Sequence, residues 1–186
     1  MIPPMLIVIA TCIGVLGSLV AVYQFAEDRR RKTVSWHHIN MLVVELVIEI
    51  ERRSFPPDLI LGVGRGGALI AAMIATNLEG RIELACMDTE GDFDGAGRKH
   101  VKLRHPESLP DLSEKHVLVV VAELYSGQDM RDAIDYLEAQ GTRRIETLAV
   151  LAGPSSNVRP DYVGQVTKHE PLAPWRLTDA ARRGRI

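Results

Sequence analysis

Hydrophobic residues recur along the chain in blocks with helical or strand-like spacing, and the first block is the longest. Residues 5–25 contain no charged side chain. At about 1.5 Å per residue, a helix of this length spans about 30 Å, the thickness of the hydrocarbon core of a bilayer. We therefore expect residues 5–25 to form a transmembrane helix, with residues 1–4 as its extracytoplasmic end. Its small residues Gly14, Gly17 and Ser18 would let a second helix approach closely.

Two other interpretations of this apolar block are open. A cleaved signal peptide has basic residues before its apolar run and a small-residue cleavage site after it, and a buried core helix has a polar face. The block shows none of these features. The basic residues at 29–32 follow the block, whereas none precedes it. This asymmetry predicts a single-pass membrane protein whose N terminus lies outside, whose basic juxtamembrane linker covers residues 26–34, and whose following domain is cytoplasmic.

Helical and strand-like spacings alternate through the rest of the chain. The expected helices cover residues 36–53, 68–77 and 128–139, and the expected strands cover residues 58–63, 81–87, 99–103, 115–123 and 144–152. Ser35 would cap the first helix, and Gly80 and Gly141 would end the other two. Strands that alternate with helices predict an α/β fold with a mostly parallel sheet flanked by helices on both faces.

Ligands of such folds bind beyond the carboxyl ends of the parallel strands. Two loops at that edge are therefore the candidate binding loops: residues 62–67, which are rich in glycine, and residues 123–129. Residues 88–97 are rich in glycine and acidic side chains. We expect them to form a mobile loop that is able to cover a site.

Charge and cysteine content narrow the functional classes. The chain of 186 residues has a formal net charge of -2 at pH 7, so no global field attracts nucleic acid or an acidic polymer. The chain has 2 cysteines, and they lie in different predicted environments: Cys12 in the apolar block and Cys86 in a buried strand. We expect no disulfide between them, which suits a reducing compartment.

The sequence predicts no metal site. His37 and His38 are adjacent on a helix, so they face different directions and do not form a shared site. The acidic residues of the 88–97 loop lack the glycine position and the final acid of a calcium loop; they are Asp88, Glu90, Asp92 and Asp94. A solvated acidic loop is the preferred interpretation, with a divalent cation site as the alternative.

Four segments, in this order and spacing, resemble the type I phosphoribosyltransferases, most closely the xanthine-guanine and hypoxanthine group. They are SWHHINMLVVELVIEI at 35–50, PPDLILGVGRGGALIAAMIA at 56–75, KHVLVVVAELYSGQDMRDAIDYLEAQG at 115–141 and RPDYVGQVTKHEPLAPW at 159–175. The resemblance implies a phosphoribosyltransferase-like domain over residues 35–176, followed by a basic C-terminal tail at 177–186.

The resemblance also implies that the loop after the first strand binds pyrophosphate, through Gly64, Arg65, Gly66 and Gly67. Glycines let backbone N–H groups approach phosphate oxygens, the following helix directs its positive end at them, and Arg65 adds a charged donor. The alternative is that these glycines only join a strand to a helix, because short glycine motifs are weak evidence alone.

The family signature after the later strand has two adjacent acids, a further acid and a Thr-Gly phosphate cradle. Val121 and Ala122 occupy the places of the adjacent acids, and Tyr125 takes the place of the next acid. Within the degenerate loop, the residues that we assign to the site are Glu123, Tyr125, Ser126, Gly127 and Gln128, of which Ser126 and Gly127 match the cradle.

The lost acids would have accepted hydrogen bonds from the ribose hydroxyls and helped to hold magnesium. Two lost bonds to charged acceptors are worth about 1.5 to 3 kcal/mol each, which is a loss of about 10² to 10⁴ in binding. Asp129, in the first turn of the next helix, would compete with a phosphate for the helix N-terminus. Glu123 is a weak candidate catalytic residue, because strand alternation predicts that it points away from the lost pair.

Near the C terminus, HEPLAPW resembles the segment that covers the purine base in the family. Trp175 matches its second aromatic residue and is our candidate for the base pocket, whereas Glu170 stands where the base-stacking tryptophan is expected. The alternative for Trp175 is a packing role, because large aromatic residues usually serve cores first.

The leading hypothesis is a membrane-anchored, cytoplasmic phosphoribosyltransferase-like domain that is catalytically impaired and acts as a phosphate- or nucleotide-binding regulatory or effector module. The alternatives are an active purine-type enzyme with an altered site that uses Glu123, and a structural interaction module without a nucleotide ligand. We expect Mg²⁺ only with phosphoribosyl pyrophosphate or pyrophosphate. The expected partners are membrane lipid, a phosphorylated small molecule or nucleotide, and a second copy or another protein, but no nucleic acid.

Overall fold

The computed structural model describes residues 33–53, 56–93, 99–104, 109–154 and 156–177. The chain divides into two units, Met1–Thr33 and Val34–Ile186, and all elements described below belong to the second. The predicted transmembrane helix at residues 5–25 and nearly all of the predicted tail lie outside the described residues. Among the helices that the structure does describe, none is long and apolar enough to cross a membrane.

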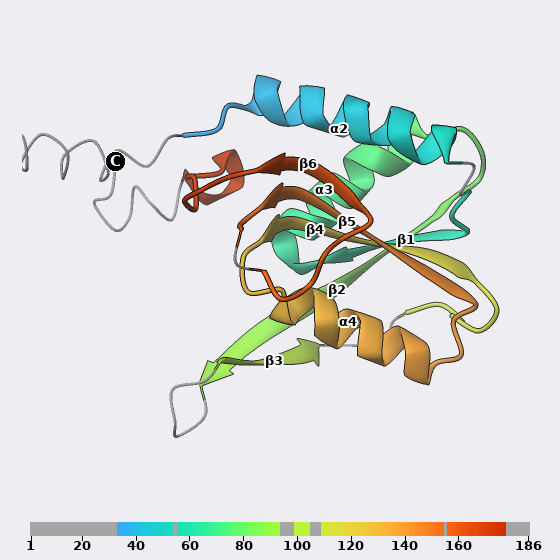
Figure 1. The fold of residues 1–186 in the computed structure, drawn as a ribbon. Coiled ribbons are helices and arrows are strands. Elements are labelled where there is room, and N and C mark those ends of the chain that lie inside the picture. Colours follow the sequence, from blue (N-terminus) through green and yellow to red (C-terminus); the bar gives the residue numbers. More distant parts are fainter. Residues whose placement is uncertain (1–32, 54–55, 94–98, 105–108, 155, 178–186) are drawn as a thin grey trace, which may run out of the picture. The chain divides into compact units, whose positions relative to one another are not determined.

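Strands and helices form the predicted α/β architecture (Figure 1). The strand order is β3-β2-β1-β4-β5-β6, where the strands are β1 (Leu59–Val63), β2 (Glu83–Phe93), β3 (Lys99–Arg104), β4 (His116–Leu124), β5 (Arg144–Ala152) and β6 (Tyr162–Val166). The strands β2, β1, β4, β5 and β6 pair in parallel, whereas β3 is antiparallel to β2. The sequence pattern did not predict β6.

Helices cover both faces of the sheet. The helices α2 (Trp36–Arg52) and α3 (Gly64–Asn77) lie on one face, and α4 (Gln128–Ala139) lies on the other (Figure 1). The predicted cap of α2 is confirmed, because Ser35 Oγ accepts a hydrogen bond from the His38 backbone N–H at 3.2 Å. A short 3₁₀ turn, η2 (Pro174–Arg176), follows β6.

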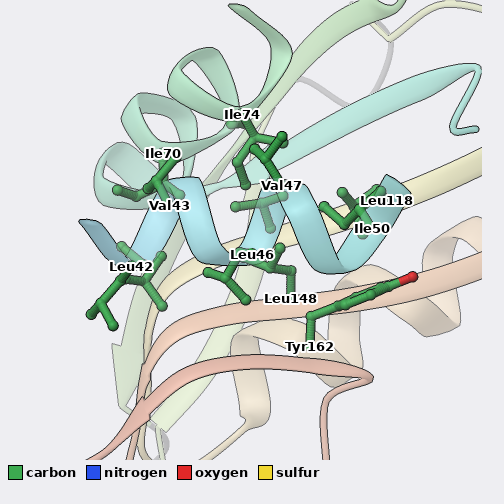
Figure 2. Packing of buried hydrophobic residues seen from close by; sticks show 14 of the residues in the cluster. Leu42, Val43, Leu46, Val47, Ile50, Ile70, Ile74, Leu118, Leu148 and Tyr162 are labelled. Carbon is green, nitrogen blue, oxygen red and sulfur yellow. The ribbon is translucent and has the colours of Figure 1, made fainter. Parts of the chain in front are cut away.

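The apolar face of α2 packs onto α3 and the sheet. Figure 2 shows Val43 and Val47 beside the α3 residues Ile70 and Ile74. Farther along the same cluster lie Leu46, Leu148 and Tyr162. The buried residues of α2 are the six that the helical spacing identifies: Ile39, Leu42, Val43, Leu46, Val47 and Ile50. Their spacing therefore predicted the core face of this helix correctly.

The prediction that residues 62–67 form a loop is wrong for most of that range. The strand β1 ends at Val63 and α3 begins at Gly64, not at residue 68. The cause is close packing: a Cβ atom on Gly62 would lie 2.5 Å from Ala68 Cα, and one on Gly67 would lie 2.6 Å from the Val120 carbonyl oxygen. These two glycines let the helix lie directly against the strands.

The prediction of a mobile loop at residues 88–97 is also wrong for residues 88–93, which belong to a strand. The strand β2 continues to Phe93 and pairs with β3, from Asp88 opposite Arg104 to Phe93 opposite Lys99. Backbone pairing with β3 stabilises a polar segment that has no apolar periodicity. Cys86 lies in β2 as expected, but it is exposed rather than buried. Residues 94–98 lie outside the described residues.

Candidate functional site

The residues assigned to the site meet at the carboxyl ends of β1 and β4. Gly66 lies in the first turn of α3, and a Cβ atom there would lie 2.9 Å from Ala122 Cβ and 3.1 Å from Trp175 Nε1. The C-terminal η2 turn thus places the Trp175 indole against the start of α3. There is no space for a side chain at position 66, so close packing alone is enough to explain the glycine there.

Glu123 joins this group through its carboxylate. Trp175 Nε1 donates a hydrogen bond to Glu123 Oε1 at 2.8 Å, and Arg176 Nη1 donates one to Glu123 Oε2 at 2.9 Å. Both carboxylate oxygens are therefore bound by side chains from the C-terminal turn. Arg176 also pairs with Glu170, which lies at the position where the family's base-stacking tryptophan was expected.

The expectation that Glu123 points away from both positions of the expected acid pair, Val121 and Ala122, is wrong, because β4 does not alternate strictly at its end. Ala122 belongs to the core on the α2 and α3 side of the sheet, whereas Val121 and Leu124 both belong to the core on the α4 side. Val121 and Leu124 are an odd number of positions apart, so the alternation is broken between them. Glu123 consequently reaches Trp175, on the same side as Ala122.

The surroundings of Glu123 change the pKa of its carboxyl group. Its side chain is 12% exposed, and burial raises the pKa of its carboxyl group, although Arg176 and the Trp175 hydrogen bond oppose the rise. The carboxylate is thus costly to ionise here despite its partners. Burial also raises the pKa of the nearby Tyr125 hydroxyl. The pair of groups occupies a poorly hydrated region at the end of β4.

The loop between β4 and α4 is braced by the segment after β5. A Cβ atom on Gly127, which has φ +80, would lie 2.5 Å from Asn157 Oδ1. The Tyr125 ring covers Gly153, where a Cβ atom would lie 2.6 Å from Tyr125 Cδ1. Asn157 was not recognised from the sequence, because nothing in its local pattern marks contact with a distant turn.

Two predicted members of the loop make internal hydrogen bonds. Ser126 Oγ accepts a hydrogen bond from the Gln128 backbone N–H at 3.3 Å, and the Gln128 side chain donates to Asp132 Oδ1 at 2.6 Å. Asp129 lies in the first turn of α4, as expected. The start of α4 thus carries the acid Asp129, which repels a phosphate, and the side-chain amide of Gln128, which already donates its hydrogen bond to Asp132. Both features disfavour phosphate binding at this helix end.

The start of α3 has the opposite character. Its first turn contains no acidic residue, and the N-cap residue Val63 makes no side-chain capping hydrogen bond. Arg65 is exposed in this turn, and Gly64 has φ 69. Uncapped N–H groups, the positive end of a helix and a guanidinium group together favour an anion. The geometry is compatible with the predicted role of Gly64, Arg65, Gly66 and Gly67.

An additional aromatic residue borders the site. Trp36, the first residue of α2, contacts Trp175 edge to face, with 6.0 Å between the ring centroids and 62° between the planes. Neither Trp36 nor Arg176 was assigned to the site from the sequence. Arg176 directly follows Trp175 in the matched segment, and this adjacency was the available signal, but the sequence placed Arg176 only as the last residue of the predicted domain, beside the basic tail.

The residues at the end of β4 do not form a magnesium site of their own. Mg²⁺ prefers oxygen ligands, but the buried side chains of Val121 and Ala122 supply none, and Glu123 is bound on both oxygens. Among the described residues, no group of three or more His, Cys, Asp or Glu side chains is placed to hold a metal. The histidines His37 and His38 are both exposed.

The fold and these segments identify the family. The chain belongs to the phosphoribosyl transferase domain family, whose model matches residues 34–181. Two curated relatives, both named Bifunctional protein PyrR, come from Corynebacterium diphtheriae and Leifsonia xyli subsp. xyli. They are 30% and 32% identical over 59% and 57% of this chain. The matched regions span only 62% and 65% of those relatives.

Solved structures share the fold at low identity. The purine phosphoribosyltransferase of Pyrococcus horikoshii aligns with a TM-score of 0.68 and 24% identity, over 77% of this chain and 92% of that one. A hypothetical protein of Neisseria gonorrhoeae with bound ppGpp aligns with a TM-score of 0.67 and 20% identity, over 83% and 95%. The Helicobacter pylori xanthine-guanine-hypoxanthine phosphoribosyltransferase gives a TM-score of 0.65 and 15% identity, over 82% and 98%.

Proposed function

We propose that this chain is a membrane-anchored phosphoribosyltransferase-fold protein that binds a phosphorylated ligand at the start of α3 and does not carry out ordinary phosphoribosyl transfer. It would act as a regulatory or effector module on the cytoplasmic side of a membrane. The anchor is supported by the uncharged apolar stretch at residues 5–25 and the basic residues that follow it. A freely diffusing salvage enzyme needs no such tether.

One observation carries the loss of transfer activity. The family's paired acids are replaced by Val121 and Ala122, both buried and apolar, and the neighbouring carboxylate of Glu123 is bound by Trp175 and Arg176. No carboxylate from this part of β4 is then available to the ribose hydroxyls. Two missing bonds to charged acceptors cost about 1.5 to 3 kcal/mol each, which weakens binding of the activated sugar by about 10² to 10⁴.

The retained ligand site is supported by the start of α3. Arg65 is exposed there, and the first turn of α3 contains no acidic residue. A relative of the same fold is described with bound ppGpp, so a nucleotide that carries a pyrophosphate group belongs in the set of candidate ligands. Magnesium would arrive with the phosphates, as it usually does in nucleotide sites, rather than in a preformed protein site.

A thermal-shift screen tests ligand binding. The full chain in detergent micelles is heated with pyrophosphate, phosphoribosyl pyrophosphate, ppGpp and purine nucleotides, with magnesium varied. A ligand at 100 times its Kd stabilises the folded state by about 2.7 kcal/mol, so at least one phosphorylated compound should raise the midpoint. Arg65→Ala should abolish the shift without changing the melting of the unliganded protein, because Arg65 is exposed. A midpoint that no phosphorylated compound changes would favour a structural module.

An active enzyme is the second candidate, and the position of Glu123 favours it. The carboxylate lies with Trp175 at the expected site rather than away from it. If Arg176 released Glu123 when substrate binds, Glu123 would be able to hold the sugar. This candidate predicts measurable transfer in the wild type and a large loss of kcat in Glu123→Ala. Equal, very low turnover in both proteins would exclude it.

A further inference from the structure

The two ends of the described domain meet at one corner. The start of α2, the end of β6 and the η2 turn lie together at one side of the sheet (Figure 1). The Val34 backbone N–H donates a hydrogen bond to the Leu172 carbonyl oxygen at 3.1 Å, and His38 Nε2 lies 2.7 Å from Gln165 Oε1, within hydrogen-bonding distance. The chain therefore enters and leaves the domain at the same place.

Large apolar side chains are exposed at this corner. Trp36 in the first turn of α2 is 48% exposed, Val166 at the end of β6 is 65% exposed, and Leu177 after η2 is 37% exposed. We call these three residues, together with the exposed Lys168, the β6 corner. Apolar residues from three separate elements, exposed at one place and accompanied by a charge, mark a surface that another molecule covers.

The charges at and around the β6 corner favour an anionic partner. The acid in the segment after β6, Glu170, already pairs with Arg176, and the first turn of α2 contains no acidic residue. The sequences that continue from the corner are also basic. Residues 26–32 hold four basic and two acidic residues, and residues 178–186 hold three basic and one acidic residue. Basic segments beside a membrane span are attracted to anionic lipid headgroups.

We infer that the β6 corner docks on the anionic surface of the bilayer that holds the anchor. The inference rests on the membrane anchor of the proposed function. The predicted span ends at residue 25 and α2 begins at Trp36, so the connection reaches at most about 40 Å. The corner is the part of the domain that this connection joins, and tryptophan, aliphatic side chains and lysine are the residue types that enter the headgroup region.

The small size of the β6 corner explains why the anchor matters. A contact of a few apolar side chains and a lysine is too weak to hold a soluble protein on a bilayer, where even one lipid chain gives only marginal binding. The anchor turns docking into an intramolecular event at high effective concentration. The amino ends of the strands are farther from the bilayer, because the nine residues of β4 span about 30 Å.

Fluorescence quenching in vesicles tests the contact. The full chain carries Cys12→Ser and Cys86→Ser, and a fluorophore is attached at Val166→Cys or, as the matched control, at Leu84→Cys. Leu84 is also apolar and is 46% exposed, but it lies near the amino end of β2. In vesicles of phosphatidylserine and phosphatidylcholine, spin-labelled lipids should quench the Val166→Cys label at least about threefold more, because about 30 Å of strand separates the two ends of the sheet.

Two further variants separate charge from apolar contact. A lysine near an anionic surface strengthens binding about fivefold, so Lys168→Gln should lower the ratio of docked to undocked domain by that factor in the anionic vesicles. It should have no effect in vesicles of phosphatidylcholine alone. Leu177→Glu should return the quenching of the Val166→Cys label to the control value. Circular dichroism of both variants confirms that the fold is kept.

Each outcome has a distinct meaning. Flotation of the vesicles reports anchoring independently of quenching, so a chain that does not float overturns the anchor and the docking with it. A chain that floats while the Val166→Cys and Leu84→Cys labels are quenched equally overturns the docking alone. A Val166→Cys label that neither the lipids nor aqueous iodide quenches overturns it in favour of a covering protein. Equal quenching in anionic and neutral vesicles overturns the requirement for anionic lipid.

Discussion

At the scale of single residues, Glu123 determines how the site is interpreted. Strand alternation predicted that this side chain points away from the positions of Val121 and Ala122, but the alternation of β4 breaks at that point and the carboxylate contacts Trp175 and Arg176, on the side of Ala122. Glu123, Trp175 and Arg176 are recognisable in the sequence, but the break in alternation is not, because it depends on how the ends of β4 and β5 pair. Glu123 is the residue whose removal most directly changes the electrostatics of the site.

The raised pKa of Glu123 predicts a specific pH dependence of stability. Burial is its main cause, so the folded chain binds this proton more tightly than the unfolded chain does. The contribution of Glu123 to stability therefore falls as pH rises from the ordinary glutamate pKa of about 4.3 through the raised value, and it is constant above. Glu123→Gln, which does not titrate, should lack this fall.

Denaturant unfolding of both proteins across the acidic range measures this difference. Wild type should lose stability relative to Glu123→Gln as pH rises, by about 1.4 kcal/mol for each unit by which the pKa is raised. An opposite slope would mean that the attraction of Arg176 outweighs burial. Arg176→Gln is the control: it removes the attraction and should steepen the fall.

Gly66→Ala tests the contact between α3 and the C-terminal turn. The added Cβ would lie 2.9 Å from Ala122 Cβ and 3.1 Å from Trp175 Nε1, so we expect a loss of about 1 to 3 kcal/mol from overpacking. The emission of Trp175 should shift as its indole moves. Combining Gly66→Ala with Ala122→Gly restores space and should recover part of the loss, whereas an unchanged loss would place the strain elsewhere.

At the scale of elements, α4 shows how a glycine at each end serves a different purpose. Gly127 precedes the helix with φ 80, and Gly141 follows it with φ 75. A Cβ atom on Gly127 would meet Asn157, Ser156 and Val158, whereas one on Gly141 would meet nothing within 4 Å. Backbone strain is therefore similar at the two positions, and crowding differs.

The pair Gly127→Ala and Gly141→Ala separates these two effects. Gly141→Ala should cost about 1 to 2 kcal/mol through the left-handed conformation alone. Gly127→Ala should cost about 1 to 3 kcal/mol more, because it also displaces the segment after β5. Thermal unfolding followed by circular dichroism measures both. Equal losses would show that the segment after β5 moves freely, and that it does not brace the loop between β4 and α4.

Periodic elements were the predictable part of the fold. The bounds of α4 and β5 and the cap of α2 follow from local spacing and agree with the structure. The start of α3 did not follow, because it depends on how closely Gly62 and Gly67 approach other elements. The strand β6 and the extension of β2 were not predictable from local spacing either, because both lack a clear apolar periodicity and depend on pairing with a neighbouring strand.

At the scale of the whole molecule, the sequence identified the family, and it predicted candidate binding loops at the carboxyl edge of the parallel strands. It also placed Gly66, Glu123 and Trp175 in one candidate site, but it did not predict the contacts among them. Those contacts link the start of α3, the end of β4 and the C-terminal turn, which are far apart in the chain. Contacts of this kind arise from tertiary packing and leave no local pattern.

The proposed anchor predicts how the protein behaves in membrane fractions. Residues 5–25 should hold the protein in the membrane fraction after carbonate extraction, because an uncharged span of this length crosses the hydrocarbon core. Removal of residues 1–32 should release it. Release of the full chain by carbonate would show that the apolar block does not span the bilayer, while retention of the shortened chain would indicate a second membrane contact.

The central claim is that the site binds a phosphorylated ligand without transferring it. A single ³¹P NMR experiment tests both parts: the full chain is titrated into phosphoribosyl pyrophosphate with magnesium and a purine base, and the spectrum is followed over hours. We predict that the pyrophosphate resonances shift or broaden saturably, that Arg65→Ala prevents this change, and that no free pyrophosphate forms. Resonances of free pyrophosphate and a nucleoside monophosphate growing at ordinary enzymatic rates would contradict the account, as would a spectrum that the protein leaves unchanged.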